Sequence, residues 1–509
     1  MANKIDSNAT GLRYAEEASL GVLPGTAGAD AVWYPLEPNS YSDFGGQIST
    51  VARNPINSSR QRKKGVTTDL DASGGFNQDL TFNNTTRLLQ GFFFADVEEK
   101  ATTAPMNSDA VVMTAITAAA DDYTAASGLP TTIVSGDLVL ASGFGVTANN
   151  GVKIANATST GTAISVSSSL SDEATPPAAA KVELIGHQFG SGTSAIAMNG
   201  SLVRLTESTL NLTTLPLSVG EWIYVGDDTA GNRFADNAGF ARISAIASGY
   251  LEFDKVSWTP SAEAGTGKTI RIYYGNVIKN QPDPADIVRR TYNVERTLGE
   301  DDDGTMSEYL VGACANELTL NVAQADKVTI DLSFVATDNE QRDGATGLKA
   351  GDRPTLSAED AYNTSSDFSR IKLASVGTNA SVSPLFAFAT EMTLTINNNV
   401  SPNKAIGVLG AFDVTAGTFE VGGSMTAYFA DIAAVQAVRN NEDITLDMIL
   451  VKDNKGMLFD IPLLALGDGR LNVEQDQAVT LPLETNAAES DFGYTLLFQS
   501  FPYLPDLAG

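Results

Sequence analysis

The sequence predicts a mainly β protein, in which a β-barrel or β-sandwich module with a flanking helix occurs twice and smaller β-domains are inserted. Three observations lead to this fold class. The chain of 509 residues is 43% hydrophobic but only 8% aromatic, which suits several packed cores better than one large core. Strongly periodic helical stretches are almost absent, and short apolar runs alternate with turn residues. We expect roughly two to four domains.

The first 105 residues carry the N-terminal part of the first module. Residues 48–82 are predicted to form a strand, a charged loop, a second strand, a turn at Gly74-Gly75 and a third strand. In the next segment, Thr85–Phe94, leucines and phenylalanines have the spacing that buries one side of a short helix. Asn84 or Thr85 is the expected N-cap of this helix.

A second copy of the same order of elements lies near the C-terminus. Residues 392–429 predict a strand, an Asn/Pro loop, a strand, a turn at Gly417 and a strand, and a helix follows from Asp431. Hairpins predicted at 291–322 and 444–473 also correspond to each other. The simplest account is a duplicated module whose first copy is interrupted. The predicted bounds are 1–105 and 276–365 for the two parts of the first module and 366–509 for the second.

The interrupting zone is low in charge and rich in Ala, Ser, Thr and Gly. One order of turn, strand, turn, strand, strand, turn, strand occurs in it twice, which predicts two related inserted β-domains at 106–190 and 191–275. The zone enters at the exposed connection after the first helix, where long insertions are tolerated because the entropy of loop closure grows slowly with length.

The charge balance argues against tight binding of nucleic acid. The chain has 32 Lys and Arg against 61 Asp and Glu, a formal net charge of −29, and such a surface repels phosphate. The acidic charge either serves solubility alone or also keeps a passing polyanion from adhering.

The sequence contains one cysteine, Cys314, so it forms no internal disulfide. This fits a reducing compartment as well as a fold that never needed disulfides. The N-terminal residues lack the apolar core of a signal peptide, and no stretch approaches the roughly 20 apolar residues that span a bilayer. We expect synthesis in the cytoplasm and no membrane insertion.

The motifs that could carry chemistry are incomplete. Residues 264–269 (AGTGKT) are close to a phosphate-binding loop, but Ala262 stands where the first glycine belongs, and a strand follows instead of a helix. The acidic run Glu300–Asp303 lacks the ligand spacing of a calcium loop and fits a solvated hairpin tip. His187 is the sole histidine, and Cys314 lies in a predicted strand. We expect no enzyme, no cofactor and no metal site.

One basic cluster stands out in this acidic chain. It has no interleaved aromatic residues, which a nucleic-acid patch would need. It is therefore either a solvated loop or a possible inter-subunit contact with an acidic surface. Its members are Arg60, Arg62, Lys63 and Lys64.

Segments near both ends of the chain carry a resemblance to a known family, the tail tube (major tail) proteins of long-tailed bacteriophages. In the first zone they are LRYAEEASLGVLP (12–24), the arginine-bearing loop that follows it, and Gly74-Gly75 before a strand and a helix. In the second zone they are EMTLTINNNV (391–400), VLGAFDVTAGTFEVGGSMTAYFAD (408–431) and NNEDITLDMILVKDNKGMLFDIPLLALG (440–467). The resemblance covers both flanking zones, 1–100 and 276–509. It implies a structural virion protein of the viral tail that self-assembles into stacked rings and forms the conduit for DNA delivery.

The resemblance also implies partners and a location. The partners would be further copies of the chain, the tail terminator and tail tip proteins, and DNA that passes transiently and without specificity. The protein would be assembled in the host cytoplasm and end in the virion tail. Loops at 36–64 and 337–370 would rearrange when rings stack.

Two further expectations combine this resemblance with the residues themselves. The excess of carboxylates predicts an acidic channel wall, which keeps contact with a moving polyanion weak. The inserted zone enters and leaves the first module at one loop and carries its own repeated cores, so it should lie outside the tube and be dispensable for assembly. The alternative function is a cell-surface or carbohydrate-binding β-protein of a phage or bacterium.

The duplication bears on the number of chains in a ring. Related tubes have six modules around the axis, so a chain with two modules would form a homo-oligomeric ring of three chains with pseudo-sixfold symmetry. In the alternative, both halves fold into one unit and six chains form the ring.

Overall fold

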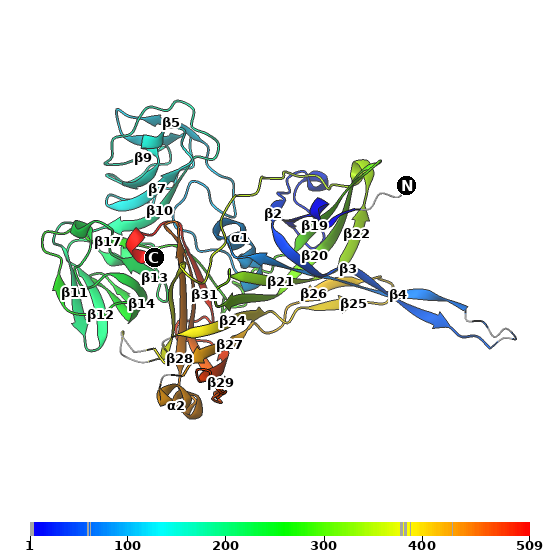
Figure 1. The fold of residues 1–509 in the computed structure, drawn as a ribbon. Coiled ribbons are helices and arrows are strands. Elements are labelled where there is room, and N and C mark those ends of the chain that lie inside the picture. Colours follow the sequence, from blue (N-terminus) through cyan, green and yellow to red (C-terminus); the bar gives the residue numbers. More distant parts are fainter. Residues whose placement is uncertain are drawn as a thin grey trace.

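The computed structural model describes residues 5–509 apart from 57, 59, 60, 62, 377–379, 381–383, 387 and 430. Strands dominate this part of the chain, and its α-helices are α1 (Phe82–Phe93) and α2 (Ile432–Asn440). The predicted mainly β class is confirmed. In Figure 1 the inserted zone lies at the left, the C-terminal strands in the centre, and a long hairpin reaches out to the right.

The first module is organised by the strand order β3-β4-β21-β20. The long hairpin β3–β4 precedes α1, and the hairpin β19–β20 follows the insertion. The first half of β20 pairs with β19 and β22, and its second half pairs with β21. The strands of this module are β1 (Gly11–Glu16), β2 (Tyr34–Leu36), β3 (Pro38–Arg53), β4 (Lys63–Asp79), β19 (Tyr292–Asp301), β20 (Gly304–Ala323), β21 (Thr329–Ala336) and β22 (Asp338–Arg342).

The second module repeats this arrangement in the order β24-β27-β30-β29. Helix α2 follows β27 as α1 follows β4, and β28–β29 is the hairpin that corresponds to β19–β20. The first half of β29 pairs with β28 and β31, and its end pairs with β30. The strands are β23 (Phe368–Ser375), β24 (Ala389–Asn397), β25 (Ser401–Lys404), β26 (Ala411–Thr415), β27 (Glu420–Tyr428), β28 (Ile444–Lys452), β29 (Lys455–Asp468), β30 (Thr480–Ala487) and β31 (Leu497–Phe501).

The two modules share one sheet. The second half of β20 pairs with β24 from Glu317–Asn397 to Ala323–Glu391, which joins the two sets of four strands into the array β3-β4-β21-β20-β24-β27-β30-β29. All pairings in this array are antiparallel. The sheet is open rather than closed into a barrel within the described chain, so the barrel of the sequence prediction is not formed by one chain.

The insertion forms two sheets. A ten-stranded sheet has the order β16-β11-β12-β15-β14-β13-β17-β10-β7-β8, and a smaller one is β5-β6-β9. Strands from both predicted inserted domains lie in the larger sheet, where β10 pairs with β17, and the boundary between those domains stays a prediction. The strands are β5 (Met113–Thr117), β6 (Asp122–Ala125), β7 (Asp137–Ser142), β8 (Gly151–Ile154), β9 (Ala163–Ser165), β10 (Lys181–Gln188), β11 (Ser194–Asn199), β12 (Leu202–Glu207), β13 (Trp222–Val225), β14 (Gly239–Ala247), β15 (Tyr250–Val256), β16 (Glu263–Ala264) and β17 (Arg271–Tyr273).

The insertion interrupts the first module but packs on the second. The exit strand β18 (Asn276–Lys279) pairs with β31. Trp222, Tyr224 and Phe240 of the insertion form one buried cluster with Ile449 and Phe501. The insertion also has a separate core of its own. Because its removal would uncover apolar strands of the second module, the expectation that the insertion is dispensable does not fit this interface.

Polar contacts fix the same interface. Arg242 of β14 is buried and donates to both carboxylate oxygens of Asp460 at 3.0 and 3.2 Å, while Asp254 accepts from its other side at 2.6 Å. Gln499 exchanges two hydrogen bonds with the backbone of Trp222. A buried ion pair that loses one partner costs about 3–5 kcal/mol, so these contacts hold the insertion in one orientation.

Some local predictions were wrong. Gly74 and Gly75 are not in a turn but in the middle of β4, where a Cβ on Gly75 would lie 2.8 Å from the carbonyl oxygen of Leu332. The glycines therefore permit close packing between strands. Helix α1 begins at Phe82, earlier than predicted, and its N-cap is Thr81 rather than Asn84 or Thr85. The predicted C-terminal helix is confirmed as α2.

Candidate functional site

One face of the eight-stranded array is polar across its width. Because side chains alternate between the two faces of a strand, residues aligned by the pairings form rows of one character. The core-facing row is Phe76, Leu332, Leu318, Ile396 and Val421, all buried. A row on the opposite face is Asp79, Thr329, Asn321, Thr393, Ser424 and Glu484. We call this second face the polar wall.

Hydrogen bonds between strands connect the side chains of the polar wall. Asp331 accepts from the amide groups of Asn77 at 2.8 Å and Asn321 at 2.6 Å. The hydroxyl groups of Thr319 and Thr395 lie 3.1 Å apart across the junction of the two modules. The wall is therefore held together laterally by its own polar groups.

The charge of the polar wall is negative. Lys404 reaches it from β25 and pairs with Asp69 at 2.6 Å and with Asp71, and Lys327 pairs with Asp79 at 2.6 Å. The hydrogen bond from Lys404 holds the pKa of Asp69 below its ordinary value. An acidic surface of this kind disfavours contact with a polyanion. The acidic residues of the wall on β4, β20, β21, β24, β27 and β30 are Asp69, Asp71, Asp79, Glu317, Asp331, Glu391, Glu420 and Glu484.

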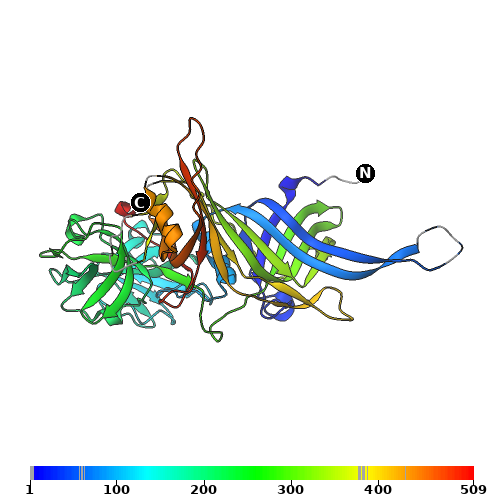
Figure 2. The same cartoon turned by 90° about the horizontal axis from the view of Figure 1, so that it is seen from below.

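The array ends in two open strand edges. Among the described residues, β3 pairs only with β4, and the end of β29 from Ala465 pairs only with β30. The chain beyond β29 continues along β30, because Asn472 and Thr480 exchange backbone hydrogen bonds. Figure 2 shows the connection between β29 and β30 projecting from the body. Open edges present unpaired N–H and C=O groups and are sites at which another chain adds a strand.

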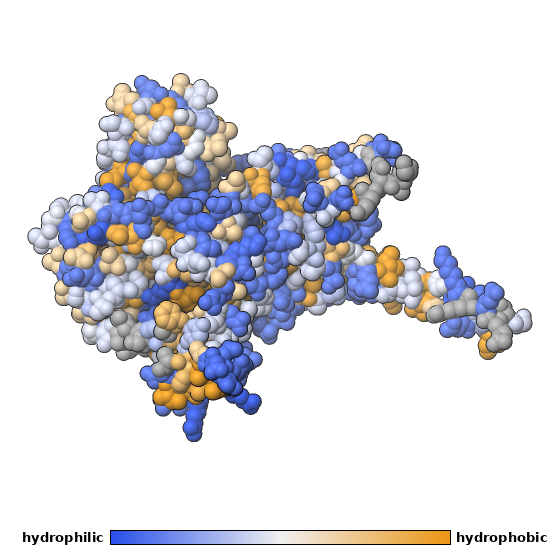
Figure 3. All heavy atoms as spheres, viewed as in Figure 1, coloured by the Kyte–Doolittle hydropathy of each residue, from blue (hydrophilic) through white to orange (hydrophobic). Residues whose placement is uncertain are grey.

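The hairpin β3–β4 extends beyond the body as an arm (Figures 1 and 2). Its exposed apolar side chains are Ile48, Val51, Ile56 and Val66, and apolar patches are visible on it in Figure 3. Of the predicted basic cluster, Lys63 and Lys64 open β4 and are exposed near the tip of the arm. Arg60 and Arg62 lie outside the described residues. The contact predicted for this cluster stays a prediction.

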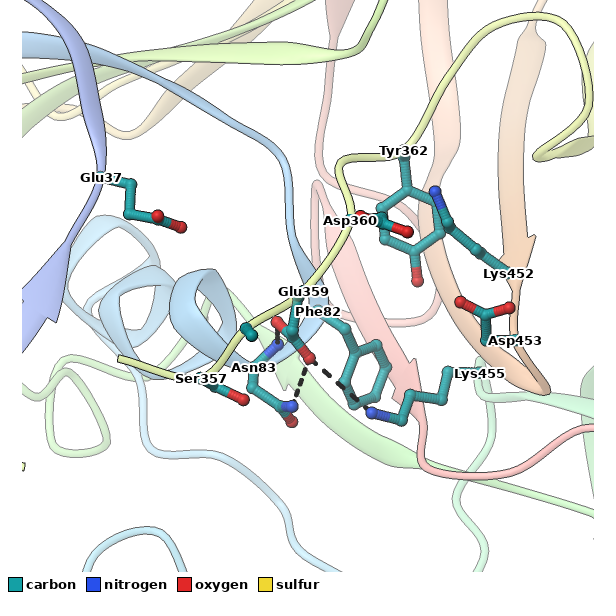
Figure 4. A pocket seen from close by; sticks show the side chains of 11 residues that line it. Glu37, Phe82, Asn83, Ser357, Glu359, Asp360, Tyr362, Lys452, Asp453 and Lys455 are labelled. Atoms are coloured by element: carbon teal, nitrogen blue, oxygen red, sulfur yellow. Dashed lines mark hydrogen bonds and ion pairs between the residues drawn. The ribbon is translucent and has the colours of Figure 1, made fainter. Parts of the chain in front are cut away.

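A pocket of about 520 Å³ lies beside the start of α1 (Figure 4). Glu359, one of the acidic residues that line it, accepts a hydrogen bond from the backbone N–H of Asn83 at 2.7 Å and pairs with Lys455 at 3.7 Å. Lys452 donates to the carbonyl oxygen of Ala361 at 2.7 Å. Glu359 therefore takes the role of a helix cap, since it satisfies a first-turn N–H group, and the pocket ties the connection between the modules to α1.

The remaining candidates of the sequence have structural environments. His187 is buried and its Nδ1 lies 2.7 Å from Asp137. Cys314 is buried, and burial raises the pKa of its thiol to about 12. The acidic run 300–303 is at the turn between β19 and β20. The segment 264–269 starts at the last residue of β16 and otherwise lies between β16 and β17. Among the described residues, no group of three or more His, Cys, Asp and Glu side chains has the arrangement of a metal site.

Sequence reasoning missed the two open edges. For the edge beyond β29, the signal is the repeated tripeptide Leu-Asn-Val, at 320–322 and 471–473, which marks equivalent places in the two modules. Only the strand pairings show that the first copy is covered and the second is not.

Comparison with known proteins identifies the family. The sequence model of a family described as "Phage tail tube protein" matches residues 7–272 and again residues 220–487. The two matches overlap and together span both modules and the insertion. No curated protein matches the chain. No helix in the described part of the chain is long and apolar enough to cross a membrane.

Proposed function

The chain belongs to the phage tail tube protein family, and from this premise we propose that it self-assembles into stacked rings that form the conduit for DNA delivery into the host. It is then a structural component of the virion tail, assembled in the host cytoplasm, and it performs no catalysis. The family match favours this function over a carbohydrate-binding surface protein.

The observation that carries the proposal is the internal junction between β20 and β24. It joins two modules of the same strand order edge to edge, and so serves as a template for joining one chain to the next. Repetition of one heterologous contact closes a ring when the rotation allows it. The six modules implied by the resemblance then require three chains, arranged with pseudo-sixfold symmetry.

The polar wall is the surface that we assign to the channel. When copies of the array are arranged around a ring axis, one face of the sheet must line the channel. The apolar face is covered by the core, including α1 and α2, so the polar wall is the face that remains. Carboxylates on the inner face keep DNA from adhering, because neutralised phosphates would otherwise hold the duplex at each ring. The insertion then lies on the outside, since it packs behind the second module and away from the arm (Figure 1).

The arm is the element that we assign to contact between rings. Exposed apolar side chains on a hairpin that leaves the body are suited to burial in a neighbouring copy. The basic residues Lys63 and Lys64 would meet an acidic surface there. Rings at the two ends of the tube would present the same surfaces to the tail terminator and tail tip proteins.

Electron cryomicroscopy of the purified protein at high concentration tests the proposal. We expect hollow filaments or rings with three chains of 53.4 kDa each, and native mass spectrometry of rings gives the same count independently. A ring of six chains would contradict the role of the duplication, and a continuous basic lumen would contradict the assignment of the polar wall. A protein that stays monomeric under all conditions in which it is folded would contradict assembly itself.

A further inference from the structure

We propose that residues 471–473 of one chain add as a strand to residues 41–44 of β3 in the next chain, in the register of the internal β20·β24 junction. The inference rests on the proposed function and names its contact between subunits. The partner is a second copy of this chain.

The strand pairings align the two modules residue by residue. In the first module Phe76 of β4 lies opposite Leu332 of β21, and in the second Met425 of β27 lies opposite Leu483 of β30. With these pairs superimposed, Thr329 corresponds to Thr480. Asn321 lies opposite Thr329 and Asn472 lies opposite Thr480, so the tripeptides 320–322 and 471–473 are equivalent in space as well as in sequence.

Equivalent residues differ sharply in exposure. Leu320 and Val322 are 1% and 8% exposed, whereas Leu471 and Val473 are 39% and 71% exposed. The first pair is covered by β24, whose Leu394 and Met392 lie opposite them. Nothing among the described residues takes that place beside the second pair. The second module therefore ends in an apolar strand edge that lacks the neighbour its counterpart has.

The missing neighbour has an equivalent at the other end of the array. Met392 lies opposite Met425, and Tyr41 lies opposite Phe76, so Tyr41 is the counterpart of Met392. In the same way Ser42, opposite Gly75, is the counterpart of Thr393, opposite Ser424. The outer edge of β3 at these residues is therefore equivalent to the edge of β24 that pairs with β20.

One irregularity of β3 fits the same register. Asp43 has φ of 46° and the pairing shifts between Ser42 and Gly45, so Asp43 is an extra residue and Phe44 takes the place that corresponds to Leu394. Phe44 lies beside Gly74, since a Cβ on Gly74 would lie 2.9 Å from the ring of Phe44. This matches the second module, in which Leu394 lies opposite Gly423.

The side chains on the two edges are chemically matched. Tyr41 and Phe44 are half-buried against the core, and their rings are 6.2 Å apart. Val473 and Leu471 would complete an apolar row beside them, as Val322 and Leu320 do beside Met392 and Leu394 within the chain. The hydroxyl of Tyr41 is buried without a hydrogen-bond partner among the described residues. Strand addition would also pair the backbone groups of both edges. The internal junction therefore predicts Val473 opposite Tyr41, and Asn472 opposite Ser42.

Cysteine cross-linking tests the register. In the double variant Ser42→Cys, Asn472→Cys, the two thiols would face each other on the polar side of adjacent chains, at a separation that a disulfide can bridge. The native Cys314 can remain, because it is buried and its raised pKa keeps it protonated. After mild oxidation of assembled protein we expect cross-linked chains in denaturing gels, with three chains in the largest species.

Two control variants use the duplication. Asn321→Cys with Thr393→Cys occupies the equivalent pair of the internal junction and should form a disulfide within one chain, which leaves the apparent mass unchanged. Ser40→Cys with Asn472→Cys is displaced along β3 and should cross-link at least tenfold less than the proposed pair.

The outcomes separate this inference from the proposed function. If the wild type forms rings, and cross-links are absent from the proposed pair or stronger in the displaced pair, the register is overturned while the tube function stands. If the wild type forms no rings or filaments, the proposed function fails and the inference fails with it. A ladder that reaches six chains would retain the strand contact and overturn the ring of three.

Discussion

The two modules of the chain have the same strand order but different surroundings. In the first module the edge of β20 is covered by the second module, whereas the equivalent edge of the second module is open. The same strand edge is thus paired with a neighbouring strand in the first module and unpaired in the second. In the proposed assembly, the duplication therefore converts a contact between two subunits into a contact within one chain.

The first hairpins of the two modules also differ. In the first module β3 and β4 continue far beyond the body, whereas the second module has short strands, β25 and β26, in the corresponding place. Lys404 of β25 pairs with Asp69 and Asp71 at the base of the arm. The second hairpin is therefore a support for the first, and alternate positions around a ring would present an arm and its support.

The largest difference between the modules is the insertion, which interrupts only the first of them. It enters the sequence of the first module but shares a buried apolar cluster with the second, so it connects the two. Five tests follow from this comparison of the modules.

The largest effect is expected from removal of the insertion. Replacing residues 106–275 by a short Gly/Ser linker removes the insertion's side chains from the buried cluster that they share with Ile449, Val451, Leu458 and Phe501. Uncovering each costs about 1.5–3 kcal/mol, and the sum rivals the whole stability of a typical domain. We expect an insoluble or non-cooperatively unfolding protein in thermal denaturation followed by circular dichroism.

The control for this deletion is a substitution within the insertion, away from the interface. Met198→Ser changes a side chain of β11 that is 41% exposed, so it leaves the interface with the second module in place and should leave cooperative unfolding intact. A soluble deletion variant that unfolds cooperatively and still forms tubes would instead support the view that the insertion is dispensable.

The next largest effect concerns the buried ion pair of that interface. Asp460→Ala leaves Arg242 buried with one partner removed and should lower the free energy of unfolding by about 3–5 kcal/mol. Asp254→Ala removes the other partner, whose side chain is 17% exposed, so water can replace it in part and the loss should be smaller. Urea denaturation measures the free energy of unfolding of both variants. Equal losses would contradict the expectation that Asp460 contributes more than Asp254.

A matched pair of leucines compares the two strand edges directly. Leu320→Ala should cost about 2–5 kcal/mol of chain stability because it opens a cavity in the core. Leu471→Ala removes an exposed side chain and should change the stability of the monomer by less than about 0.5 kcal/mol, yet it should raise the protein concentration needed for assembly. Light scattering measures assembly, and an unchanged threshold would weaken the role of Leu471.

Much of this architecture could be predicted from the sequence, but the decisive details could not. The order of strands and the helix at Ile432–Asn440 follow from periodicity and turn residues, and the two modules were found from their shared order. The pair Gly74-Gly75 was misread because a glycine pair marks either a turn or a close approach of strands, and only the neighbour at Leu332 decides between them.

The site was harder to predict than the fold. The acidic composition anticipated a negative surface, but the polar wall depends on register, since a shift by one residue would send Asp331 to the core and Leu332 to solvent. The packing of Trp222 against the second module had no local signal, because contacts between segments so distant in sequence are set by the tertiary fold.

The smallest effect is expected at the base of the arm. Lys404→Met removes the pairing with Asp69 and Asp71, all of them surface residues, so global stability should hardly change. The arm should open more often, and hydrogen exchange of the backbone amides over residues 66–71 should accelerate. As a control, Lys327→Met breaks the pair with Asp79 at the body end of β4 and should leave exchange in that stretch unchanged.

Acid should act on the arm as Lys404→Met does. Because Lys404 lowers the pKa of Asp69, the pairing stabilises the arm above the ordinary pKa of an aspartate and is lost as the pH falls through the lowered value. The pairing is not lost at mildly alkaline pH, since the same contact raises the pKa of Lys404. We therefore expect exchange at residues 66–71, corrected for its intrinsic dependence on pH, to rise in the wild type at acidic pH and to stay constant in Lys404→Met. A similar rise in both proteins would show that other carboxylates control the arm.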